Sequence, residues 1–252
     1  MAPRPVKRPA PRSASTTAVP LIHGRNAVLE AARAGRVLRV YQASGLGHDP
    51  RLDELARLTT IEVVATERLD VIAPGVHQGV AAELKPRKEW TLRELTATNP
   101  SLLVALDSIM DPQNLGAILR SAEVAGAEGA VIPEHRSAPL SPAAVKASSG
   151  ASELLRIAKV SGLPSAIPEI KRSGIWCVAL DPRGELQAWE FDFTQRVCVV
   201  VGSEGEGVHR LVKERCDARV RLPVKGHIAS LNASAAAAAL LYEVMRQRES
   251  NA

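Results

Sequence analysis

The sequence is poor in aromatic residues and in cysteines. Phe, Trp and Tyr make up 3% of the 252 residues, which is too little for an open platform on which nucleic-acid bases stack. The three cysteines, Cys177, Cys198 and Cys216, are odd in number and far apart in the sequence. This spacing argues against a disulfide framework and against a zinc site. We therefore expect no bound metal and a reducing, cytoplasmic environment.

The sequence also lacks a long apolar run. The longest, at 235–242, is mostly alanine, whereas a membrane helix needs about 18 apolar residues in a row. The first twenty residues contain no apolar segment between their charges, so they do not resemble a secretory signal. Apolar residues nevertheless make up 46% of the chain, which is enough for one large or two smaller domains with real cores. We expect no membrane association.

Positive charge is concentrated at the N-terminus. The tail at 1–19 contains four basic residues and no acid, so it supplies four of the five net positive charges and leaves the rest of the chain nearly neutral. Charge alone therefore does not identify a nucleic-acid-binding face. The tail is rich in proline and has little to bury, so we expect it to be disordered. It is either a solvated extension or an arm that contacts RNA.

Alternating strands and helices predict two α/β domains. The first, 20–84, is expected to open with a turn and a helix at 21–32. Its β-branched and aromatic stretches predict strands, and its apolar periodicity predicts helices. The strands are expected at 37–43, 61–65 and 78–84, and the helices at 49–58 and 67–72. Polar residues at 85–89 begin a predicted linker, 85–99.

The second domain, 100–252, begins at 101–107 with a continuous apolar run that is typical of a buried parallel strand. The helix expected at 115–125 carries one apolar stripe, and Gly126 is placed to end it. The last element is an alanine-rich helix at 230–248. Further strands are expected at 129–132, 155–160, 175–180, 196–201 and 219–222.

Three segments of the second domain are candidates for a functional site. The first, 111–120, runs from a strand end into a helix, and ligands bind at such positions in open α/β sheets. Asn114 is a candidate N-cap. Arg120 could be an ordinary exposed helix residue that pairs with Glu123, three positions further on. Taken alone, the segment favours a structural role.

The second segment is a glycine-rich turn after the strand at 196–201. Gly202 and Gly207 have the spacing of a P-loop, but Val208 and His209 stand where Lys and Ser or Thr are required. The glycine intervals do not fit the dinucleotide-binding fingerprint either. Acidic residues in the turn, among them Glu204, would repel a phosphate. The turn therefore suits a neutral or cationic ligand, and a nucleotide hydrolase would lack its phosphate-binding lysine.

The third segment, 222–234, joins a short strand to the last helix. Ser230 is a candidate N-cap of that helix, and Asn232 and Ser234 are short polar residues in its first turn. Helix capping alone would explain residues of this kind. The alanine run beyond them has a high helix propensity and favours close packing against another helix.

Together, in this order and spacing, the three segments resemble the SpoU (TrmH) family of the SPOUT methyltransferase superfamily. The stretch at 23–28 resembles the start of a small substrate-recognition domain that is similar to certain ribosomal proteins. Two positions depart from the usual family pattern: Ala233 replaces a valine, and Val224 replaces a frequent methionine. Both remain apolar. The matching residues are Asn114, Arg120 and Gly126, then Gly202, Glu204 and Gly207, and finally Pro223, Gly226, Ser230, Leu231, Asn232 and Ser234.

The resemblance implies an α/β fold, with a SPOUT domain that has a parallel sheet and a trefoil knot, preceded by the small ribosomal-protein-like α/β domain. It implies S-adenosyl-L-methionine as cofactor, with Gly202, Leu222 and Leu231 around it. It also implies a homodimer whose sites lie at the subunit interface.

The resemblance implies five catalytic residues. Because a guanidinium is effectively never deprotonated in proteins, we expect Arg120 to grip an RNA phosphate and stabilise negative charge rather than act as a base. Asn114 and Asn232 would orient the ribose and Arg120. Glu204 would hold Arg120 or Ser230, and Ser230 would donate a hydrogen bond within the site.

The implied reaction is methylation of a ribose 2′-hydroxyl in RNA. The small first domain favours a guanosine of 23S ribosomal RNA. Transfer RNA stays open as an alternative substrate. A non-catalytic RNA-binding relative is a further alternative, which the complete set of motif residues argues against.

Overall fold

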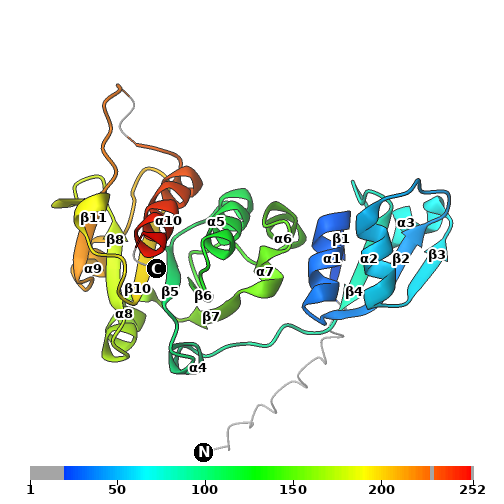
Figure 1. The fold of residues 1–252 in the computed structure, drawn as a ribbon, viewed down its shortest axis with the longest axis horizontal. Coiled ribbons are helices and arrows are strands. Elements are labelled where there is room, and N and C mark those ends of the chain that lie inside the picture. Colours follow the sequence, from blue (N-terminus) through cyan, green and yellow to red (C-terminus); the bar gives the residue numbers. More distant parts are fainter. Residues whose placement is uncertain (1–19, 228–229, 251–252) are drawn as a thin grey trace, which may run out of the picture.

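The computed structural model describes residues 20–227 and 230–250, which form two α/β units joined by a linker (Figure 1). The first unit is built on a four-stranded mixed sheet of strand order β1-β4-β2-β3. Its elements are β1 (Leu21–His23), α1 (Arg25–Arg33), β2 (Val37–Ala43), α2 (Pro50–Leu58), β3 (Ile61–Val64), α3 (Thr66–Ile72) and β4 (Val80–Leu84).

Alternating side chains of this sheet fill two small cores. Val40 and Ala82 face α1 and α2 on one side, together with the buried Val28 and Leu55. The neighbouring Tyr41 faces α3 on the other side, with Ala81 and Leu69. Period-two alternation therefore places one face of each strand against each helical layer.

The second unit contains a seven-stranded sheet of order β7-β6-β5-β10-β8-β11-β9, in which every strand pair is parallel. The central strands β5 and β10 are buried along their whole length, as expected of a parallel sheet covered on both faces. The elements are α4 (Leu92–Ala97), β5 (Leu102–Asp107), α5 (Pro112–Val124), β6 (Gly129–Pro133), α6 (Pro142–Ala147), α7 (Ala151–Leu154), β7 (Arg156–Val160), α8 (Leu163–Arg172), β8 (Trp176–Leu180), β9 (Leu186–Gln187), β10 (Val197–Gly202), α9 (Arg210–Lys213), β11 (Ala218–Arg221) and α10 (Ala233–Glu249).

Helices cover the two faces of the large sheet in separate groups. Helices α5 and α10 lie side by side on one face (Figure 1), where Leu119 and Leu240 belong to the larger core. Helices α4, α8 and α9 cover the other face, with Leu95, Ile167 and Val212 in the second core. Because every strand pair is parallel, the carboxyl ends of all the strands point to one edge of the sheet.

Two helices begin at other residues than the sequence predicted. The N-cap of α5 is Asp111, whose carboxylate accepts the N–H groups of Gln113 and Asn114, so the prediction of Asn114 as N-cap is wrong. Pro112 stabilises this earlier start because its ring presets a helical φ. The N-cap of α10 is Asn232 and not Ser230, because the Asn232 side chain accepts the first free N–H groups of the helix.

The structure contains elements that the sequence analysis missed. The stretch at 21–32 begins with the short strand β1, and residues 85–99, predicted as a linker, contain α4 with the buried Leu92 and Leu95. Helices α6, α7, α8 and α9 were also missed. The trefoil knot and the likeness of the first domain to ribosomal proteins stay predictions. The expected disorder of the tail concerns residues outside the described ranges.

The cysteines are closer in space than in sequence. Cys177 and Cys198 occupy opposite positions on β8 and β10, and all three thiols are free. The contact with Cys198 and burial raise the pKa of Cys177, and burial raises the pKa of Cys216. Since the thiolate is the reactive form, the raised pKa values disfavour reactivity of Cys177, which lies in the second core, and of Cys216, which packs against it.

Candidate active site

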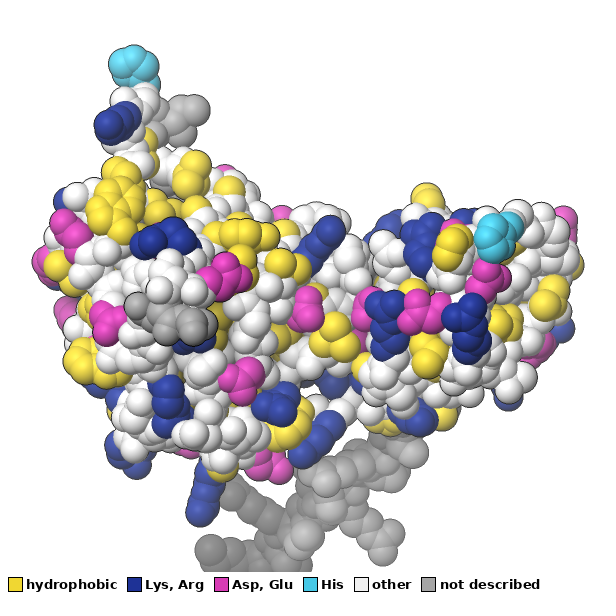
Figure 2. Space-filling model, in the orientation of Figure 1, with side chains coloured by type: hydrophobic (Ala, Val, Ile, Leu, Met, Phe, Trp, Pro, Cys, Tyr) yellow, Lys and Arg dark blue, Asp and Glu magenta, His cyan; other side chains and the backbone are white. Residues whose placement is uncertain are grey.

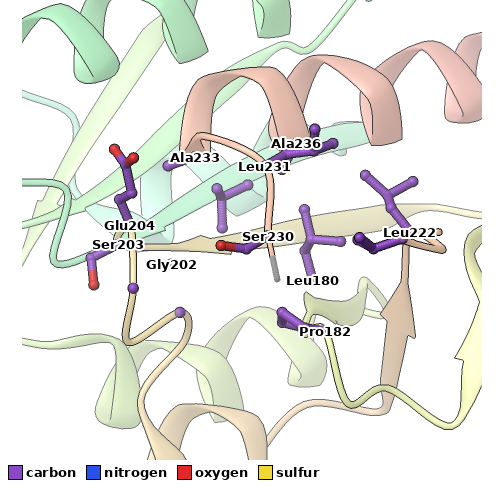
Figure 3. Close-up of a pocket in the computed structure, with 14 residues that line it drawn as sticks. Leu180, Pro182, Gly202, Ser203, Glu204, Leu222, Ser230, Leu231, Ala233 and Ala236 are labelled. Atoms are coloured by element: carbon purple, nitrogen blue, oxygen red, sulfur yellow. The ribbon is translucent and has the colours of Figure 1, made fainter. Parts of the chain in front are cut away.

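A pocket lies at the carboxyl edge of the large sheet, between the ends of β8, β10 and β11 and the start of α10 (Figure 3). All three predicted cofactor-binding residues, Gly202, Leu222 and Leu231, line it. Two predicted catalytic residues, Glu204 and Ser230, line it as well. The remaining lining residues are Leu180, Pro182, Val201, Ser203, Gly205, Gly207, Val224, Ala233 and Ala236.

The residues at 202–207, here called the glycine turn, fold back tightly on themselves. The N–H of Gly207 donates to the carbonyl of Ser203 at 3.0 Å. A Cβ on Gly202 would lie 1.9 Å from the carbonyl carbon of Gly207, so only glycine fits there. Gly205 and Gly207 adopt positive φ values of 93° and 68°, which other residues rarely adopt. The glycines thus permit a narrow turn whose backbone faces the pocket.

Asn232 connects the three motif segments through one side chain. Its Oδ1 caps α10 by accepting hydrogen bonds from Ser234 N at 2.9 Å and Ala235 N at 3.3 Å. Its Nδ2 donates to Asn114 Oδ1 at 3.0 Å and to Glu204 Oε2 at 3.1 Å. Because the capping N–H groups require an acceptor, the amide can only turn its Nδ2 toward Asn114 and Glu204. The structure therefore brings three of the five predicted catalytic residues into one hydrogen-bonded cluster.

Arg120 lies apart from that cluster. It is exposed in α5, six residues beyond Asn114. Within the described residues its guanidinium makes no hydrogen bond or ion pair, and Glu204 accepts from Asn232 rather than from Arg120 or Ser230. The Ser230 hydroxyl points toward the side of the pocket that carries Gly202 and Glu204 (Figure 3). The structure thus leaves the Arg120 side chain available to a substrate.

The walls of the pocket are mainly apolar. Glu204 is the one charged side chain among the described residues that line it. Figure 2 shows hydrophobic side chains gathered near the base of the segment that projects between β11 and α10. Val224 and Leu231, which belong to that segment and line the pocket, are 44% and 50% exposed. Such exposed apolar groups at a pocket mouth fit a ligand with an apolar part.

Sequence reasoning missed several residues around the pocket. Leu180 and Pro182 line it from the end of β8, and the buried acids Asp107 and Asp181 stand at the ends of β5 and β8, the two strands that flank β10. The signal that could have identified them is their position, because ligands bind beyond the carboxyl ends of parallel strands. Without the strand order, the sequence does not show which of these ends adjoin.

The comparisons with known proteins agree with this geometry. Residues 101–242 match the SpoU rRNA Methylase family, and residues 21–90 match the domain described as RNA 2'-O ribose methyltransferase substrate binding. The chain is 37% identical over 223 residues to the 23S rRNA (guanosine-2'-O-)-methyltransferase RlmB of Pseudomonas syringae, covering 84% of this chain and 89% of that protein. It is 39% identical over 236 residues to the putative TrmH family tRNA/rRNA methyltransferase YacO of Bacillus subtilis, covering 89% and 94%.

A solved structure is similar over nearly the whole chain. The SpoU methyltransferase AviRb from Streptomyces viridochromogenes, in complex with the cofactor AdoMet, has a TM-score of 0.77 and 27% identity, and the match covers 91% of this chain and 90% of that one. The fold and the pocket define an α/β methyltransferase with a separate substrate-binding domain. This chain belongs to the SpoU rRNA Methylase family, which confirms the predicted family and fold class.

S-adenosyl-L-methionine fits the residues of the pocket. The apolar walls from Leu180, Leu222 and Leu231 suit the flat faces of the adenine ring, and the narrow glycine turn offers backbone groups that can hydrogen-bond its polar atoms at close approach. The acidic Glu204, which disfavours a phosphate, is compatible with a positively charged sulfonium. The predicted cofactor is confirmed by the family and by the AdoMet complex of AviRb.

Proposed function

We propose that this chain methylates the 2′-hydroxyl of a guanosine ribose in 23S ribosomal RNA, with S-adenosyl-L-methionine as methyl donor. The observation that carries the proposal is the Asn232 cluster, which joins the three motif segments beside an apolar pocket at the sheet edge. When bound, the cofactor supplies an activated methyl group.

The residues of the chain divide the work between binding and positioning. Gly202, Leu222 and Leu231 hold the cofactor. Asn114 and Asn232 orient the ribose, and Ser230 donates a hydrogen bond within the site. Holding the two reactants in line supplies a large part of the rate enhancement of such a transfer.

Arg120 grips an RNA phosphate. Its exposed guanidinium has no partner among the described residues, and a guanidinium binds phosphate oxygens in a bidentate manner. The same charge stabilises negative charge that develops near the 2′-oxygen. A role as general base is ruled out by the very high pKa of arginine side chains.

The ribosomal substrate is supported by the first domain. The match to RlmB spans 84% of this chain and so includes residues of the substrate-binding domain as well as the catalytic one. The names of other relatives leave both ribosomal and transfer RNA open. We favour ribosomal RNA because RlmB, which this chain matches over 89% of that protein's length, is named as a 23S rRNA methyltransferase.

The proposal includes a cytoplasmic homodimer. Arg120 lies outside the hydrogen-bonded cluster of its own chain, so a second copy is the natural partner to complete the site. No helix within residues 20–227 and 230–250 combines the length and hydropathy that a membrane crossing needs. The same ranges contain no group of three or more acidic, His or Cys side chains suited to a metal ion.

Methyl transfer in vitro tests the proposal. The purified chain is incubated with methyl-labelled S-adenosylmethionine and with either 23S ribosomal RNA or transfer RNA. We expect label in the ribosomal RNA, at the 2′-oxygen of a guanosine. Label in transfer RNA alone would mean that transfer RNA, and not ribosomal RNA, is the substrate. Cofactor binding without methyl transfer to either RNA would support a non-catalytic RNA-binding relative.

A further inference from the structure

Asp107 is a buried carboxylate that the proposed reaction does not use. It ends β5 and is 6% exposed. Its Oδ2 accepts the backbone N–H of His209 at 2.7 Å and lies 3.1 Å from His209 Nδ1. A carboxylate is costly to remove from water unless hydrogen bonds replace the lost solvation. The Asp107–His209 contact therefore holds both residues firmly in place.

This contact closes the loop that contains the glycine turn. In the parallel pairing of β5 and β10, Gly202 lies opposite Asp107. The chain leaves the sheet at Gly202, passes through the glycine turn and returns to Asp107 at His209. The loop at 203–208 thus leaves the sheet opposite Asp107 and is tied back to the Asp107 carboxylate at His209. The hydrogen bond from Asn232 to Glu204 fixes the middle of it at 3.1 Å.

A second strand-end acid holds the short helix that follows. Lys213, the last residue of α9, lies 3.0 Å from Asp181 Oδ2, and Asp181 stands between the pocket residues Leu180 and Pro182. Burial acts to raise the pKa of Asp181, but Lys213 and the N–H of Arg183 outweigh it and lower the pKa overall. Asp181 is therefore a carboxylate, and α9 is tied at both of its ends to the carboxyl edge of the sheet.

We propose that Asp107 is a positioning residue for cofactor binding, which holds the glycine turn in its ligand-binding conformation through the backbone N–H of His209. The Lys213–Asp181 pair supports the same segment from the other end of α9. The inference rests on the proposed function, because it takes the ligand of the pocket to be S-adenosylmethionine. Asp107 itself touches neither reactant.

The variant His209→Pro tests the backbone hydrogen bond. His209 has a φ of −59°, which proline can adopt, and the substitution removes the N–H donor. Because the proline ring carbon takes the place of that hydrogen, it also pushes the Asp107 carboxylate away, and Asp107→Ala in the same chain removes this clash. Asp107→Ala removes the acceptor. Calorimetry with S-adenosylmethionine alone, without RNA, should show Kd raised about tenfold to a hundredfold by either variant, since a hydrogen bond to a charged group is lost.

Three further variants separate the hydrogen bond from other effects. His209→Ala removes the imidazole with its contacts to Asp107 and Glu206 but keeps the backbone N–H. Because the proposal assigns the effect to the N–H, Kd should stay within about threefold of the wild-type value. Glu214→Gln removes the exposed Arg210–Glu214 pair of the same segment and should leave Kd unchanged. The double variant Asp107→Ala/His209→Pro should bind no more weakly than His209→Pro, because both changes remove the same contact.

The kinetic pattern distinguishes positioning from general damage. At saturating RNA, KM for the cofactor should rise with Kd, while kcat at saturating cofactor stays within about threefold of wild type. If Asp107→Ala does not fold, His209→Pro set against His209→Ala provides the same comparison, because only the first of the two lacks the backbone N–H. Wild-type cofactor affinity in His209→Pro and in the Asp107 variants would overturn the proposal. Failure of the wild-type chain to methylate RNA would overturn the proposed function but leave these binding constants interpretable.

Discussion

At the residue scale, Asn232 combines a structural role with a proposed functional one. Its oxygen caps α10, and its amide nitrogen binds Asn114 and Glu204. The sequence predicted both its place in the site and the helix that follows, but assigned the cap to Ser230. Serine and asparagine cap helices about equally well, so propensity could not choose between them. The hydrogen bond to Asn114, which lies 118 residues away in the sequence, favours Asn232 as the N-cap.

The variant Asn232→Asp separates the two roles of this side chain. Aspartate caps a helix as well as asparagine does, so the free energy of unfolding should change by less than about 1 kcal/mol. The variant loses the Nδ2 donor and places a carboxylate beside Glu204, so methyl transfer should fall about tenfold to a hundredfold. Thermal unfolding and single-turnover transfer measure the two effects. Adding Glu204→Gln should relieve the repulsion, and full activity in Asn232→Asp would contradict the account.

Arg120 gives a second prediction at this scale. Because it is exposed and has no partner among the described residues, Arg120→Ala should change stability by less than about 0.5 kcal/mol. Its affinity for S-adenosylmethionine should stay at the wild-type value. Methyl transfer should fall roughly 10²–10³-fold, as when a residue that stabilises transition-state charge is removed. Arg120→Lys keeps the charge without the bidentate geometry, so its rate of methyl transfer should lie between those of the wild type and Arg120→Ala. Wild-type turnover in Arg120→Ala would show that Arg120 has no role in methyl transfer.

At the element scale, long periodic segments were predictable and short ones were not. The stripe of α5 and the continuous apolar runs of β5 and β10 identified themselves by periodicity and length. Strand β1 has three residues and α9 has four, too few to show a period. Helix α8 contains Pro168 in its interior, which argues against a helix in sequence reasoning. The start of α5 moved to Asp111 because an Asp-Pro pair is a stronger helix start than Asn114.

The glycine turn yields a prediction for a whole element. In Gly202→Ala the new Cβ would collide with the backbone of Gly207, so the turn must open. We expect cofactor binding to be lost, because the turn forms one wall of the pocket. Calorimetry with S-adenosylmethionine measures this directly. In the control Gly47→Ala the added methyl meets no atom within 4 Å, and affinity should not change. Wild-type affinity in Gly202→Ala would show that S-adenosylmethionine binds outside this pocket.

At the scale of the whole molecule, a buried ion cluster joins the two domains. The Glu153 side chain on α7 is 1% exposed and pairs with Arg36 of the first domain and with Arg87 of the connecting segment. Burial and the nearby charge of Arg36 lower the pKa of Arg87 to about 10. Close to it, Gly150 approaches Glu30 of α1 so closely that a Cβ would not fit. The sequence could not predict these contacts, since they link residues more than 60 positions apart.

Glu153→Gln tests whether this cluster orients the RNA-binding domain. The variant leaves two half-buried arginines without their anion, which weakens the contact between domains. We expect KM for RNA to rise several-fold, while cofactor affinity stays unchanged. The control Glu54→Gln removes an exposed pair with Arg33 inside the first domain, where the cost is at most about 1 kcal/mol. An unchanged KM for RNA in Glu153→Gln would mean that the domains act independently.

The central claim is that this chain methylates a ribose in ribosomal RNA. The most direct test is to map 2′-O-methylation across ribosomal and transfer RNA in cells that carry the intact gene, no gene, or the Arg120→Ala variant. The account predicts one 23S guanosine mark that is present with the intact gene and absent in the other two. Unchanged 23S methylation together with the loss of a transfer-RNA mark would contradict it.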